Sequence, residues 1–411
     1  MHIAVFLQHY HTPDCPTAAR PYALVERLGK DHAVTVITTR AWEDTRTAHR
    51  FPWAPPGVDL VRFDVPYANA MSPAQRLTSF LNYAARAVRH GLQMPQPDLI
   101  LGSSTPLTAA AAAGLVAHLR DVPWVFEVRD LWPAFPIQMG ALPDCGLHAL
   151  LRWGEAALYR SAAEVVTVSP DMEQHVRVQA PSASVTTLPY GAAPALLDAA
   201  GEEARRSVTH HLPPDRRFLV LYAGTFGRAN AIPTLLDAAR RLVSARSDVL
   251  VALAGRGHHA PLVDQAARRH DAIRRVPPLP YPEALALFER ADLSLVPFRD
   301  RPVLAANAPG KLFDSLATGT PVVVTNPGWT KRFVRQHGCG WVVPPEAPDA
   351  LADQIQSVLA SPGARREASQ NARAAAQRHF DRATILDRYT ALVEDVGRTS
   401  PARHLPHPRT S

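Results

Sequence analysis

The sequence predicts two α/β domains, each of which contains a doubly wound parallel sheet. Short apolar runs alternate with helix-length segments along most of the chain, and this alternation is typical of parallel sheets that helices cover on both faces. The apolar runs form two series, which a stretch rich in charged residues and proline separates. The length of 411 residues agrees with two or three domains rather than one.

The first series of apolar runs predicts seven strands. The runs are short, are rich in Val, Ile and Leu, and end at polar residues, Gly or Pro. They cover residues 2–8, 34–38, 60–65, 99–103, 124–128, 165–169 and 185–188. The segments 18–29 and 73–92 lie between them and show the apolar spacing of helices.

The second series predicts six strands, followed by a helical end. The strands cover residues 218–223, 250–254, 273–276, 293–297, 322–325 and 341–343. Helical spacing is found at residues 234–245, 282–290, 368–379 and 383–396. We therefore expect an N-terminal Rossmann-like domain at 1–198, a linker at 199–216, a C-terminal Rossmann-like domain at 217–378, a final helix within 379–396 and a disordered tail at 397–411.

The basic charge of the chain carries little information about its partners. The 44 Lys and Arg exceed the 37 Asp and Glu by seven, but 41 of the 44 are Arg, and lysine occurs only at positions 30, 311 and 331. Arg398, Arg403 and Arg409 place three of the seven charges in the expected tail. We attribute the abundance of arginine to a compositional bias, and we expect no nucleic-acid partner.

The cysteines and the apolar segments indicate a cytoplasmic protein. Cys15, Cys145 and Cys339 are too few and too far apart for a disulfide framework or a zinc site. The first residues do not have the pattern of a signal peptide. The longest near-apolar run, about 14 residues from position 106, is too short to cross a bilayer. We expect attachment to the inner face of the plasma membrane at most.

Three motifs of other ligand-binding enzymes are absent from the sequence. A dinucleotide-binding oxidoreductase needs a Gly-rich turn after its first strand, yet residues 9–20 contain no glycine and the later Gly-x-Gly at 255–257 lacks a third glycine. The sequence has no Asp-x-Asp, which metal-dependent sugar transferases place on a divalent ion, so we expect no metal. It also has no P-loop motif.

The segment 309–319 has the features of an anion site at the start of a helix. Pro309 is suited to a first helical turn and Gly319 to a helix end. The free backbone N–H groups and the dipole of such a helix attract an anion, and Lys311 adds a positive charge. Asp314, one turn later, is suited to accept hydrogen bonds from ribose hydroxyls. The alternative is a buried structural helix that carries an exposed lysine.

A Gly-x-x-Gly-Arg loop follows the first strand of the second series. Gly224 and Gly227 allow a tight turn at the carboxyl end of that strand, where open parallel sheets bind their ligands. Arg228 comes next and is suited to bidentate contact with phosphate oxygens. In a chain so rich in Arg, a surface arginine without a ligand is the alternative.

Three charged residues, Glu127, Arg129 and Asp130, end an otherwise apolar strand. Charged groups at such a place are costly if they are buried without partners. An internal pair between Arg129 and a carboxylate is one interpretation. The other is a cluster that binds sugar hydroxyls or holds an acceptor.

Together these three segments resemble glycosyltransferase family 4, whose members have the GT-B fold. The matching motifs are Glu-x-Arg-Asp-Leu-Trp-Pro at residues 127–133, Tyr-Ala-Gly-x-x-Gly-Arg at 222–228 and Pro-x-Lys-Leu-Phe at 309–313. They are most similar to the branch that transfers N-acetylated amino sugars to lipid-linked acceptors in bacterial cell-surface polysaccharide synthesis. The resemblance extends from the first strand to about residue 389.

The resemblance implies a retaining, metal-independent transfer from a nucleotide-diphosphate sugar, expected to be of the UDP-N-acetylhexosamine type, with no further cofactor. Two domains would face each other across a cleft, the second would hold most of the donor, and the final helix would cross back to the first. Lys311, Arg228 and the N–H groups of Gly310 and Leu312 would stabilise the leaving diphosphate. Asp314 would hold the ribose.

The same resemblance places the base of the donor beside backbone groups around Gly255 and Leu279–Tyr281. One acid of the family's Glu-x7-Glu pair is missing, because its position is Ala306. Asn307 is the neighbouring polar side chain that would take its place.

On the acceptor side the sequence departs from the family at two positions. The glycine pair of the first loop is absent, and Arg20 is the matching charged residue. The histidine that many members carry near the reaction centre falls at the end of the fifth strand, so Asp130 is our candidate for contact with the sugar or the acceptor. Glu127, His9 and His11 complete the acceptor-side candidates. The implied acceptor is polyprenyl-linked or a saccharide.

The segment 73–92 predicts a helix that suits an anionic membrane surface. Leu77 and Leu81 are among its apolar residues on one side, and Arg86 and Arg89 are among the basic residues elsewhere on it. Each basic residue near such a surface contributes about 1 kcal/mol. A surface helix that faces the protein core is the alternative.

Three other functions agree with the same motifs. The first is a transferase of the same fold that uses GDP-mannose or another donor, or a small-molecule acceptor. The second is a UDP-sugar 2-epimerase, which would convert a UDP-sugar without an acceptor. The third is a non-catalytic sugar-nucleotide binding subunit, which the missing acid at Ala306 permits.

Overall fold

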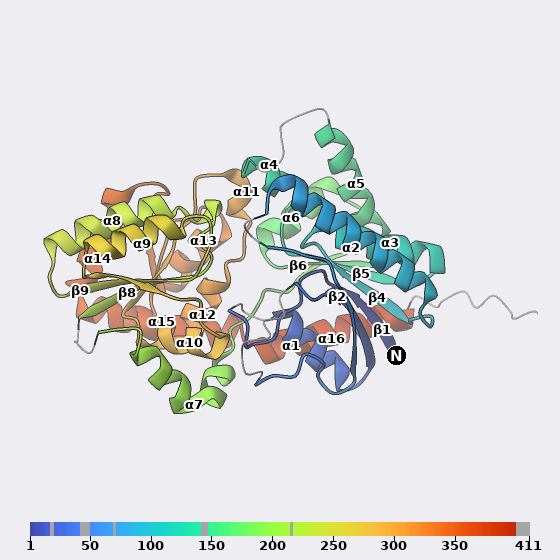
Figure 1. The fold of residues 1–411 in the computed structure, drawn as a ribbon, viewed down its shortest axis with the longest axis horizontal. Helices are drawn as coiled ribbons and strands as arrows, with labels where there is room; N and C mark the ends of the chain where they lie inside the picture. The colour runs from blue at the N-terminus through green and yellow to red at the C-terminus, as the bar shows by residue number, and fades with distance from the viewer. Residues whose placement is uncertain (17–19, 42–49, 69–70, 141–146, 214–216, 400–411) are drawn as a thin grey trace, which may run out of the picture.

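The computed structural model of the chain describes residues 1–16, 20–41, 50–68, 71–140, 147–213 and 217–399, which form two α/β domains (Figure 1). The strands of the first domain are β1 (His2–Phe6), β2 (Ala33–Thr39), β3 (Val58–Phe63), β4 (Leu99–Ser103), β5 (Trp124–Val128), β6 (Glu164–Thr167) and β7 (Val185–Thr187). Those of the second are β8 (Phe218–Ala223), β9 (Val249–Ala254), β10 (Ile273–Val276), β11 (Leu293–Val296), β12 (Val322–Val324) and β13 (Gly340–Val342).

Helices cover both sheets (Figure 1). Up to β7 they are α1 (Arg20–Gly29), α2 (Pro73–Gln93), α3 (Leu107–Arg120), α4 (Ala134–Gln138), α5 (Leu147–Ser161) and α6 (Pro170–Gln179). After β7 they are α7 (Pro194–Thr209), α8 (Ile232–Ala245), α9 (Ala260–Arg269), α10 (Tyr281–Arg290), α11 (Pro302–Ala305), α12 (Gly310–Thr318), α13 (Trp329–His337), α14 (Pro348–Leu359), α15 (Pro362–His379) and α16 (Arg382–Thr399), with a 3-10 turn η1 (Arg228–Asn230) after β8.

Both sheets are doubly wound, and the pairings between their strands are parallel. The strand order is β3-β2-β1-β4-β5-β6-β7 in the first sheet and β10-β9-β8-β11-β12-β13 in the second. The winding direction therefore reverses between β1 and β4, and again between β8 and β11. Ligands of open α/β sheets bind beyond the carboxyl ends of strands at such a reversal, so the loops after these four strands are the expected sites.

The predicted fold class is confirmed, and each predicted strand has a counterpart whose ends differ by no more than two residues. The largest shift is at β3, which begins at Val58 rather than at residue 60. It begins early because Gly57, with φ of +78°, turns the chain so closely past Gly29 that a Cβ on Gly57 would lie 2.1 Å from the carbonyl oxygen of Gly29. The ladder with β2 then starts at once, at the pair Val58 and Val34.

The stretch expected to be a linker, residues 199–216, is for the most part helical. Helix α7 covers residues 194–209, with a kink at Gly201, and residues 214–216 lie outside the described part of the chain. Leu197, Ala204 and Val208 pack into the second domain, in one cluster with residues of β8, β9 and α10. The mixed charge and the prolines of this stretch concealed a helix whose apolar residues face the next domain.

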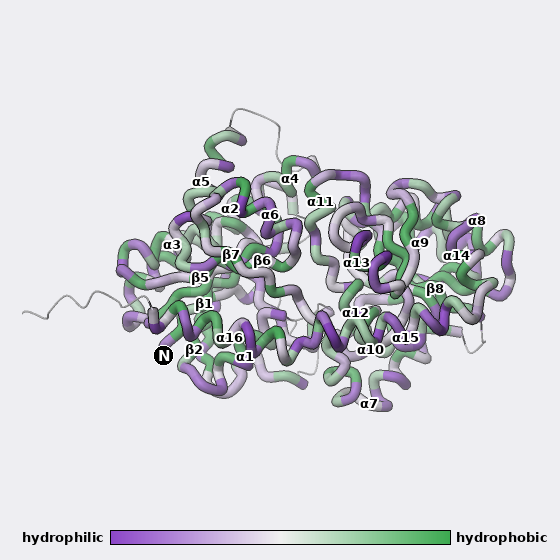
Figure 2. Tube along the Cα trace, turned by 180° about the vertical axis from the view of Figure 1, so that it is seen from behind, coloured by the Kyte–Doolittle hydropathy of each residue, from purple (hydrophilic) through white to green (hydrophobic). Residues whose placement is uncertain are grey.

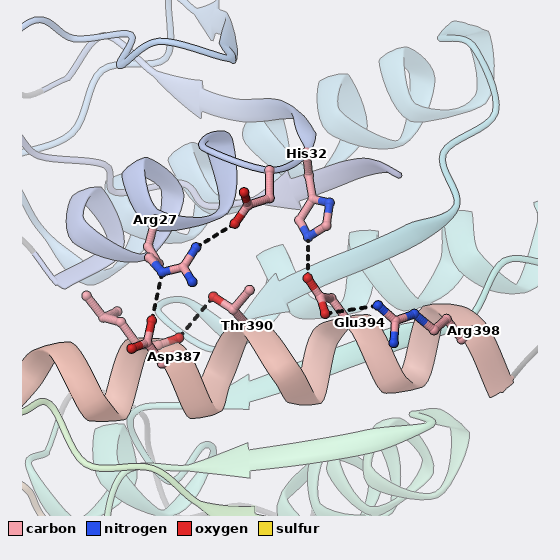
Figure 3. Close-up of polar contacts among 8 residues, drawn as sticks. Arg27, His32, Asp387, Thr390, Glu394 and Arg398 are labelled. Atoms are coloured by element: carbon pink, nitrogen blue, oxygen red, sulfur yellow. Dashed lines mark hydrogen bonds and ion pairs between the residues drawn. The ribbon is translucent and has the colours of Figure 1, made fainter.

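Helix α16 returns from the second domain to the first. Its residues Ile385, Tyr389 and Val393 belong to the same apolar cluster as β1 and β4. Polar contacts with the end of α1 hold its outer side (Figure 3). In these, Arg27 donates to Asp387 at 2.8 Å, and a ring nitrogen of His32 lies 3.1 Å from a Glu394 oxygen. Residues 397–399, expected in the tail, are the last turn of α16, and residues 400–411 lie outside the described chain.

The chain crosses between the domains twice, and the two crossings lie side by side. On the way out, residues 189–193 follow β7; on the way back, residues 380–382 precede α16. Ala192 N donates to the carbonyl of Phe380 at 2.6 Å, and Arg382 N donates to the carbonyl of Ala192 at 3.2 Å, so that a short parallel bridge joins Ala192 and Asp381. We refer to residues 189–193 and 380–382 together as the crossing.

Apolar packing is continuous from one domain to the other. Figure 2 shows hydrophobic residues concentrated in central strands such as β1 and β8. One buried cluster contains residues of both sheets and of α12. Hydrogen bonds join the domains as well. Ser169 Oγ donates to the carbonyl of Ala306 at 2.5 Å, and Trp329 N donates to Oδ2 of Asp171 at 3.1 Å. These hydrogen bonds join the two domains near the start of α6 and the start of α13.

Candidate functional site

Lys311 lies near the start of α12 in a partly buried, largely apolar setting. Pro309 caps the helix with extended backbone angles, and Gly319 ends it with φ of +73°. Nζ of Lys311 donates to Oδ1 of Asn230 at 3.2 Å, and it lies 5.4 Å and 5.2 Å from the ring centroids of Tyr222 and Phe298. Such positions over ring faces are favourable for a cation.

Burial lowers the pKa of Lys311 to about 8, and the nearby Asp314 carboxylate partly opposes this shift. A buried ammonium at a helix N-terminus is electrostatically unfavourable until an anion arrives, because the helix dipole and the charge have the same sign there. Such an arrangement suits an anionic ligand at the start of the helix. Lys311 is partly buried, which differs from the exposed lysine of the alternative interpretation, in which the helix is structural.

Two glycine loops, after β8 and after β9, pack against each other beside Lys311. A Cβ on Gly224 would lie 3.1 Å from Cε of Lys311. A Cβ on Gly255 would lie 1.8 Å from the carbonyl oxygen of Gly224, and one on Gly257 would lie 2.8 Å from the backbone of Phe226. All three glycines have φ near +150°. At Gly255 and Gly257 glycine is required because the backbones approach too closely for any side chain, and at Gly224 glycine is favoured because other residues rarely adopt its backbone angle.

In the loop after β8 and the turn η1, one polar side chain contacts Lys311 and another is exposed to solvent. Arg228 is exposed, and no carboxylate pairs with it among the residues that the structure describes. Its charge acts on His259, whose pKa is lowered by burial first and then by the charges of His258, Arg228 and Arg299. Asn230, two residues after Arg228, is the side chain that contacts Lys311. Sequence reasoning did not identify Asn230, because no motif marks it.

Asp314 is buried and bonded to a residue far away in the sequence. The hydroxyl of Tyr281 donates to Oδ1 of Asp314 at 2.7 Å, and Nη2 of Arg382 donates to the same hydroxyl at 3.0 Å. Burial raises the pKa of Asp314 to about 6, while Tyr281, Arg382 and Lys311 act to lower it. Sequence reasoning expected only the backbone of Tyr281 near the donor, and it identified neither the Tyr281 hydroxyl nor Arg382.

The segments expected to frame the rest of the donor are also near these groups. The backbone carbonyl of Asn307 accepts from Nε1 of Trp329 at 2.9 Å, whereas its side-chain Oδ1 is buried and has no hydrogen-bond partner among the described residues. Leu279 is buried in a core cluster of the second domain, so only its backbone is available to a base. Gly310 and Leu312 are in the first turn of α12. The N–H of Leu312 donates to the carbonyl of Pro309 at 3.0 Å, so Gly310 is the better placed of the two to donate to an anion.

The end of β5 holds Asp130 in a hydrogen-bonded turn. Ser104, which follows β4, accepts from the backbone N–H of Arg129 at 2.9 Å through its hydroxyl. Oγ1 of Thr105 donates to Oδ2 of Asp130 at 3.4 Å. Burial raises the pKa of Asp130 to about 6, and Arg129 and Thr105 partly oppose this shift. The carboxylate is ionised at neutral pH.

Tyr190, in the crossing, connects this turn with α12. Nε of Arg129 donates to the hydroxyl of Tyr190 at 3.4 Å, and its guanidinium lies 5.7 Å from the ring centroid. On its other side, the ring of Tyr190 meets Phe313 edge to face at 6.1 Å. The predicted acceptor-side and donor-side groups are therefore linked through one aromatic residue, which sequence reasoning did not identify.

His9 and His11, in the loop after β1, are neutral at physiological pH. Burial and the charge of Arg129 lower the pKa of His9 to about 3. The pKa of His11 is also about 3, as a result of burial, His9, Arg129 and Arg256. Since Arg256 belongs to the second domain and Arg129 to the first, His11 lies where the domains meet.

Arg20 and Glu127, both expected on the acceptor side, pair with each other in the interior. Nη2 of Arg20 lies 3.5 Å from a Glu127 oxygen, and each residue is only 3% exposed. Arg20 also donates to the carbonyl of Leu188 at 3.0 Å and lies over the ring of Tyr190, 4.8 Å from its centroid. The pair therefore packs against Tyr190 in the interior of the first domain.

Comparison with known protein families supports the division of the chain. A model described as "Glycosyl transferase 4-like domain" matches residues 17–191, and one described as "Glycosyl transferases group 1" matches residues 205–375. The first match includes Asp130 and begins after β1 and the loop with His9 and His11. The second match includes Arg228, Lys311 and Asp314.

Individual relatives and solved structures agree with these matches. The glycosyltransferase WbjE of Pseudomonas aeruginosa is 25% identical over 75% of this chain and 78% of its own length. WcaI of Escherichia coli K12, a glycosyl transferase named for colanic acid biosynthesis, is 25% identical over 72% and 73%. The structure of HepE from Anabaena in complex with UDP-glucose superposes with a TM-score of 0.67 at 16% identity, over 96% of this chain and all of that one.

Proposed function

Because this chain is a GT-B glycosyltransferase, with a glycosyl transferase 4-like domain followed by a group 1 domain, we propose that it transfers a sugar from a nucleotide-diphosphate donor to a lipid-linked acceptor in cell-surface polysaccharide synthesis. The observation that carries the proposal is Lys311, a partly buried ammonium at the start of α12 and beside the glycine loop after β8. The complex of HepE with UDP-glucose and the name of WcaI support a UDP-linked donor and a polysaccharide product. We propose the UDP-N-acetylhexosamine type.

The donor-side groups act on the leaving diphosphate. When the bond between the anomeric carbon and the diphosphate oxygen breaks, negative charge develops on the diphosphate. Lys311, the first-turn N–H groups of α12 and the exposed guanidinium of Arg228 are positive groups that stabilise this charge. Their effect is largest in the transition state, since the partly buried site excludes much of the competing water.

On the acceptor side, Asp130 and His11 take the roles of hydrogen-bonding groups. Asp130 is ionised at neutral pH, so it accepts a hydrogen bond from a sugar or acceptor hydroxyl. His11 is neutral, so one ring nitrogen accepts while the other donates. Transfer proceeds with retention of the anomeric configuration and without a metal ion. Both statements are tested by recording the anomeric signals of the product and by measuring transfer in the presence of EDTA.

The test of the proposal is a thermal-shift screen of the purified chain against UDP-sugars, GDP-sugars and the free nucleotides, because a ligand bound only to the folded state raises the unfolding midpoint. We expect a UDP-sugar to give the largest shift and to release UDP when a polyprenyl-linked acceptor is added. No shift with any nucleotide contradicts the proposal. Conversion of a UDP-sugar without acceptor identifies an epimerase, and binding without turnover identifies a binding subunit.

We further propose that the first domain attaches to an anionic membrane surface. Among the described residues no helix is long and apolar enough to span a membrane. In α2, Tyr83 faces the core, whereas Leu77 and Leu81 are 51% and 54% exposed. In α5, Leu150 and Trp153 are 60% and 65% exposed. Both helices lie on the same side of the first domain in Figures 1 and 2.

Charges around these exposed apolar residues support the same surface. Arg86 and Arg89 of α2 and Arg152 of α5 are exposed, while Glu155, the one acid of α5, is buried. Basic residues beside exposed Leu and Trp are typical of helices that bind anionic lipid surfaces.

Co-sedimentation with liposomes of rising phosphatidylserine or phosphatidylglycerol content measures this attachment. We expect binding to increase with the anionic fraction, to fall in Leu81→Ser and Trp153→Ser, and to be unchanged in Leu262→Ser. Leu262 is the matched control, since it is 41% exposed on α9 of the other domain. Binding that does not depend on anionic lipid contradicts the proposal.

A further inference from the structure

The phenol of Tyr281 lies between a cation of the crossing and a carboxylate of the donor-binding helix. Its hydroxyl donates to Oδ1 of Asp314 at 2.7 Å and accepts from Nη2 of Arg382 at 3.0 Å. We propose that Tyr281 is a positioning residue that couples the crossing to α12, so that the affinity for a nucleoside diphosphate depends on this bridge. The inference rests on the proposed function through the role of α12 in holding the diphosphate.

The three members of the bridge are buried, which makes each contact energetically important. Tyr281 is 2% exposed, and Asp314 and Arg382 are each 8% exposed. Buried charges are destabilising unless partners compensate them. Nη2 of Arg382 has two partners, the Tyr281 hydroxyl and the carbonyl of Gly191 at 3.2 Å, whereas Nε and Nη1 have none among the described residues. The hydroxyl is thus the link through which this cation and the Asp314 carboxylate stabilise each other.

The backbone fixes both ends of the bridge. At one end, the N–H of Tyr281 donates to the carbonyl of Pro13, in the loop after β1, at 2.9 Å. At the other end, Gly191 has φ of +74°, and a Cβ there would lie 2.9 Å from Cα of Arg382. Only a glycine allows the outgoing chain to approach Arg382 this closely. Tyr281 therefore contacts the first domain, the crossing and α12 at the same time.

The bridge sets the charge pattern that α12 presents to a ligand. Asp314 lies one turn after Lys311, and its charge acts to raise the pKa of that lysine. Without the Tyr281 hydroxyl, the carboxylate loses a buried hydrogen bond and is free to turn toward Lys311 or to take up a proton. Either change reduces what the helix start offers to a diphosphate and to a ribose. The expected effect is therefore on binding rather than on the chemical step.

Tyr281→Phe is the direct test, because it removes one oxygen and keeps the ring. Tyr389→Phe is the matched control, since Tyr389 is also fully buried but its hydroxyl has no partner among the described residues. Calorimetric titration with UDP and with GDP gives the dissociation constant, and denaturant unfolding gives the stability. We expect Tyr281→Phe to weaken nucleotide binding about tenfold or more, with kcat changed by less than about twofold, and Tyr389→Phe to bind as the wild type does.

Two further comparisons of nucleotide binding distinguish a positioning role of Tyr281 from a general loss of structure. In a double-mutant cycle, Tyr281→Phe should weaken binding no further when it is added to Asp314→Ala, because both remove the same hydrogen bond. Arg382→Met should weaken binding, Arg382→Lys should recover part of it, and Arg388→Met, on the exposed side of α16, should have no effect. The variants at Arg382 and Arg388 keep the test valid if Tyr281→Phe fails to fold.

The outcomes that overturn the inference are distinct from those that overturn the proposed function. Wild-type affinity for the nucleotide in Tyr281→Phe, or full additivity with Asp314→Ala, overturns the bridge while the wild type still binds nucleotide. A wild-type chain that binds neither UDP nor GDP overturns the proposed function and this inference with it.

Discussion

Replacing Lys311 by Met is expected to increase stability while it removes function. Met keeps much of the length of the side chain and no charge. Burial lowers the pKa of Lys311 from 10.5 to about 8, which corresponds to roughly 3 kcal/mol against the charged form in the folded state. At pH 7 the amine is protonated in both the folded and the unfolded chain, so this cost is fully present. The cost disappears only as the pH rises from about 8 to 10.5.

The contacts that Lys311 loses offset part of that cost. One hydrogen bond to Asn230 contributes about 1 kcal/mol, and the contacts of the ammonium with the rings of Tyr222 and Phe298 contribute about 0.5–1 kcal/mol each. The net effect of Lys311→Met at pH 7 is therefore a small gain in the free energy of unfolding. Toward a ligand the balance is reversed, because each charge-assisted bond to the diphosphate contributes about 1.5–3 kcal/mol. We expect roughly 10- to 100-fold weaker nucleotide binding and turnover lower by about 10²–10³.

Two measurements on the same samples check this expectation. Denaturant titration at pH 7 gives the stability of the variant, and calorimetry with UDP and GDP gives the affinity. Lys30→Met is the control, since Lys30 directly follows α1 and is exposed. A Lys311→Met chain that binds nucleotide as tightly as the wild type, or that loses affinity only together with stability, refutes the assignment of the anion site.

Three further predictions concern the same site. In calorimetric titrations the affinity for the nucleoside diphosphate should fall about tenfold between pH 7 and pH 9, because the Lys311 ammonium, with its pKa of about 8, loses its proton in this range. Lys311→Arg should show no such decline, because the guanidinium stays protonated. Gly255→Ala should lower the free energy of unfolding in denaturant titrations by at least about 1–3 kcal/mol, because the added Cβ would lie 1.8 Å from the carbonyl oxygen of Gly224. The control Gly363→Ala should not lower it, because no atom lies within 4 Å of the added Cβ. Asp130→Ala should lower kcat by about 10- to 100-fold, because a hydrogen bond to a charged group contributes about 1.5–3 kcal/mol, while the nucleotide affinity stays unchanged. Equal kcat would remove Asp130 from the reaction.

The strands were predictable because their pattern is local. A strand that helices bury on both faces must be apolar throughout, so runs such as 124–128 and 249–254 are visible in the sequence without knowledge of the fold. The anion helix was predictable for a similar reason, since its cap at Pro309 and its end at Gly319 lie within eleven residues. Helix α7, in the stretch expected to be a linker, was not predictable in this way, because it combines a kink at Gly201 with mixed charge and packs its apolar residues against the second domain.

The partners of the site residues were not predictable, because they depend on contacts between distant parts of the chain. Asp314 and Tyr281 are 33 positions apart, and Tyr281 and Arg382 are 101 apart. No spacing rule relates such residues before the fold is known. Arg20 and Glu127 were selected for their charge alone, and only the fold shows that they compensate each other inside the first domain.

The return of α16 to the first domain has a consequence for synthesis on the ribosome. The sheet of the first domain is encoded by residue 187, but Ile385, Tyr389 and Val393, which cover one of its faces, come about 200 residues later. At roughly 5–20 residues per second, the first domain waits on the order of 10–40 s for its last helix. Throughout that time an apolar face beside β1 and β4 is open to chaperones or to other nascent chains. The part of the enzyme that is made first is therefore the last to be completed.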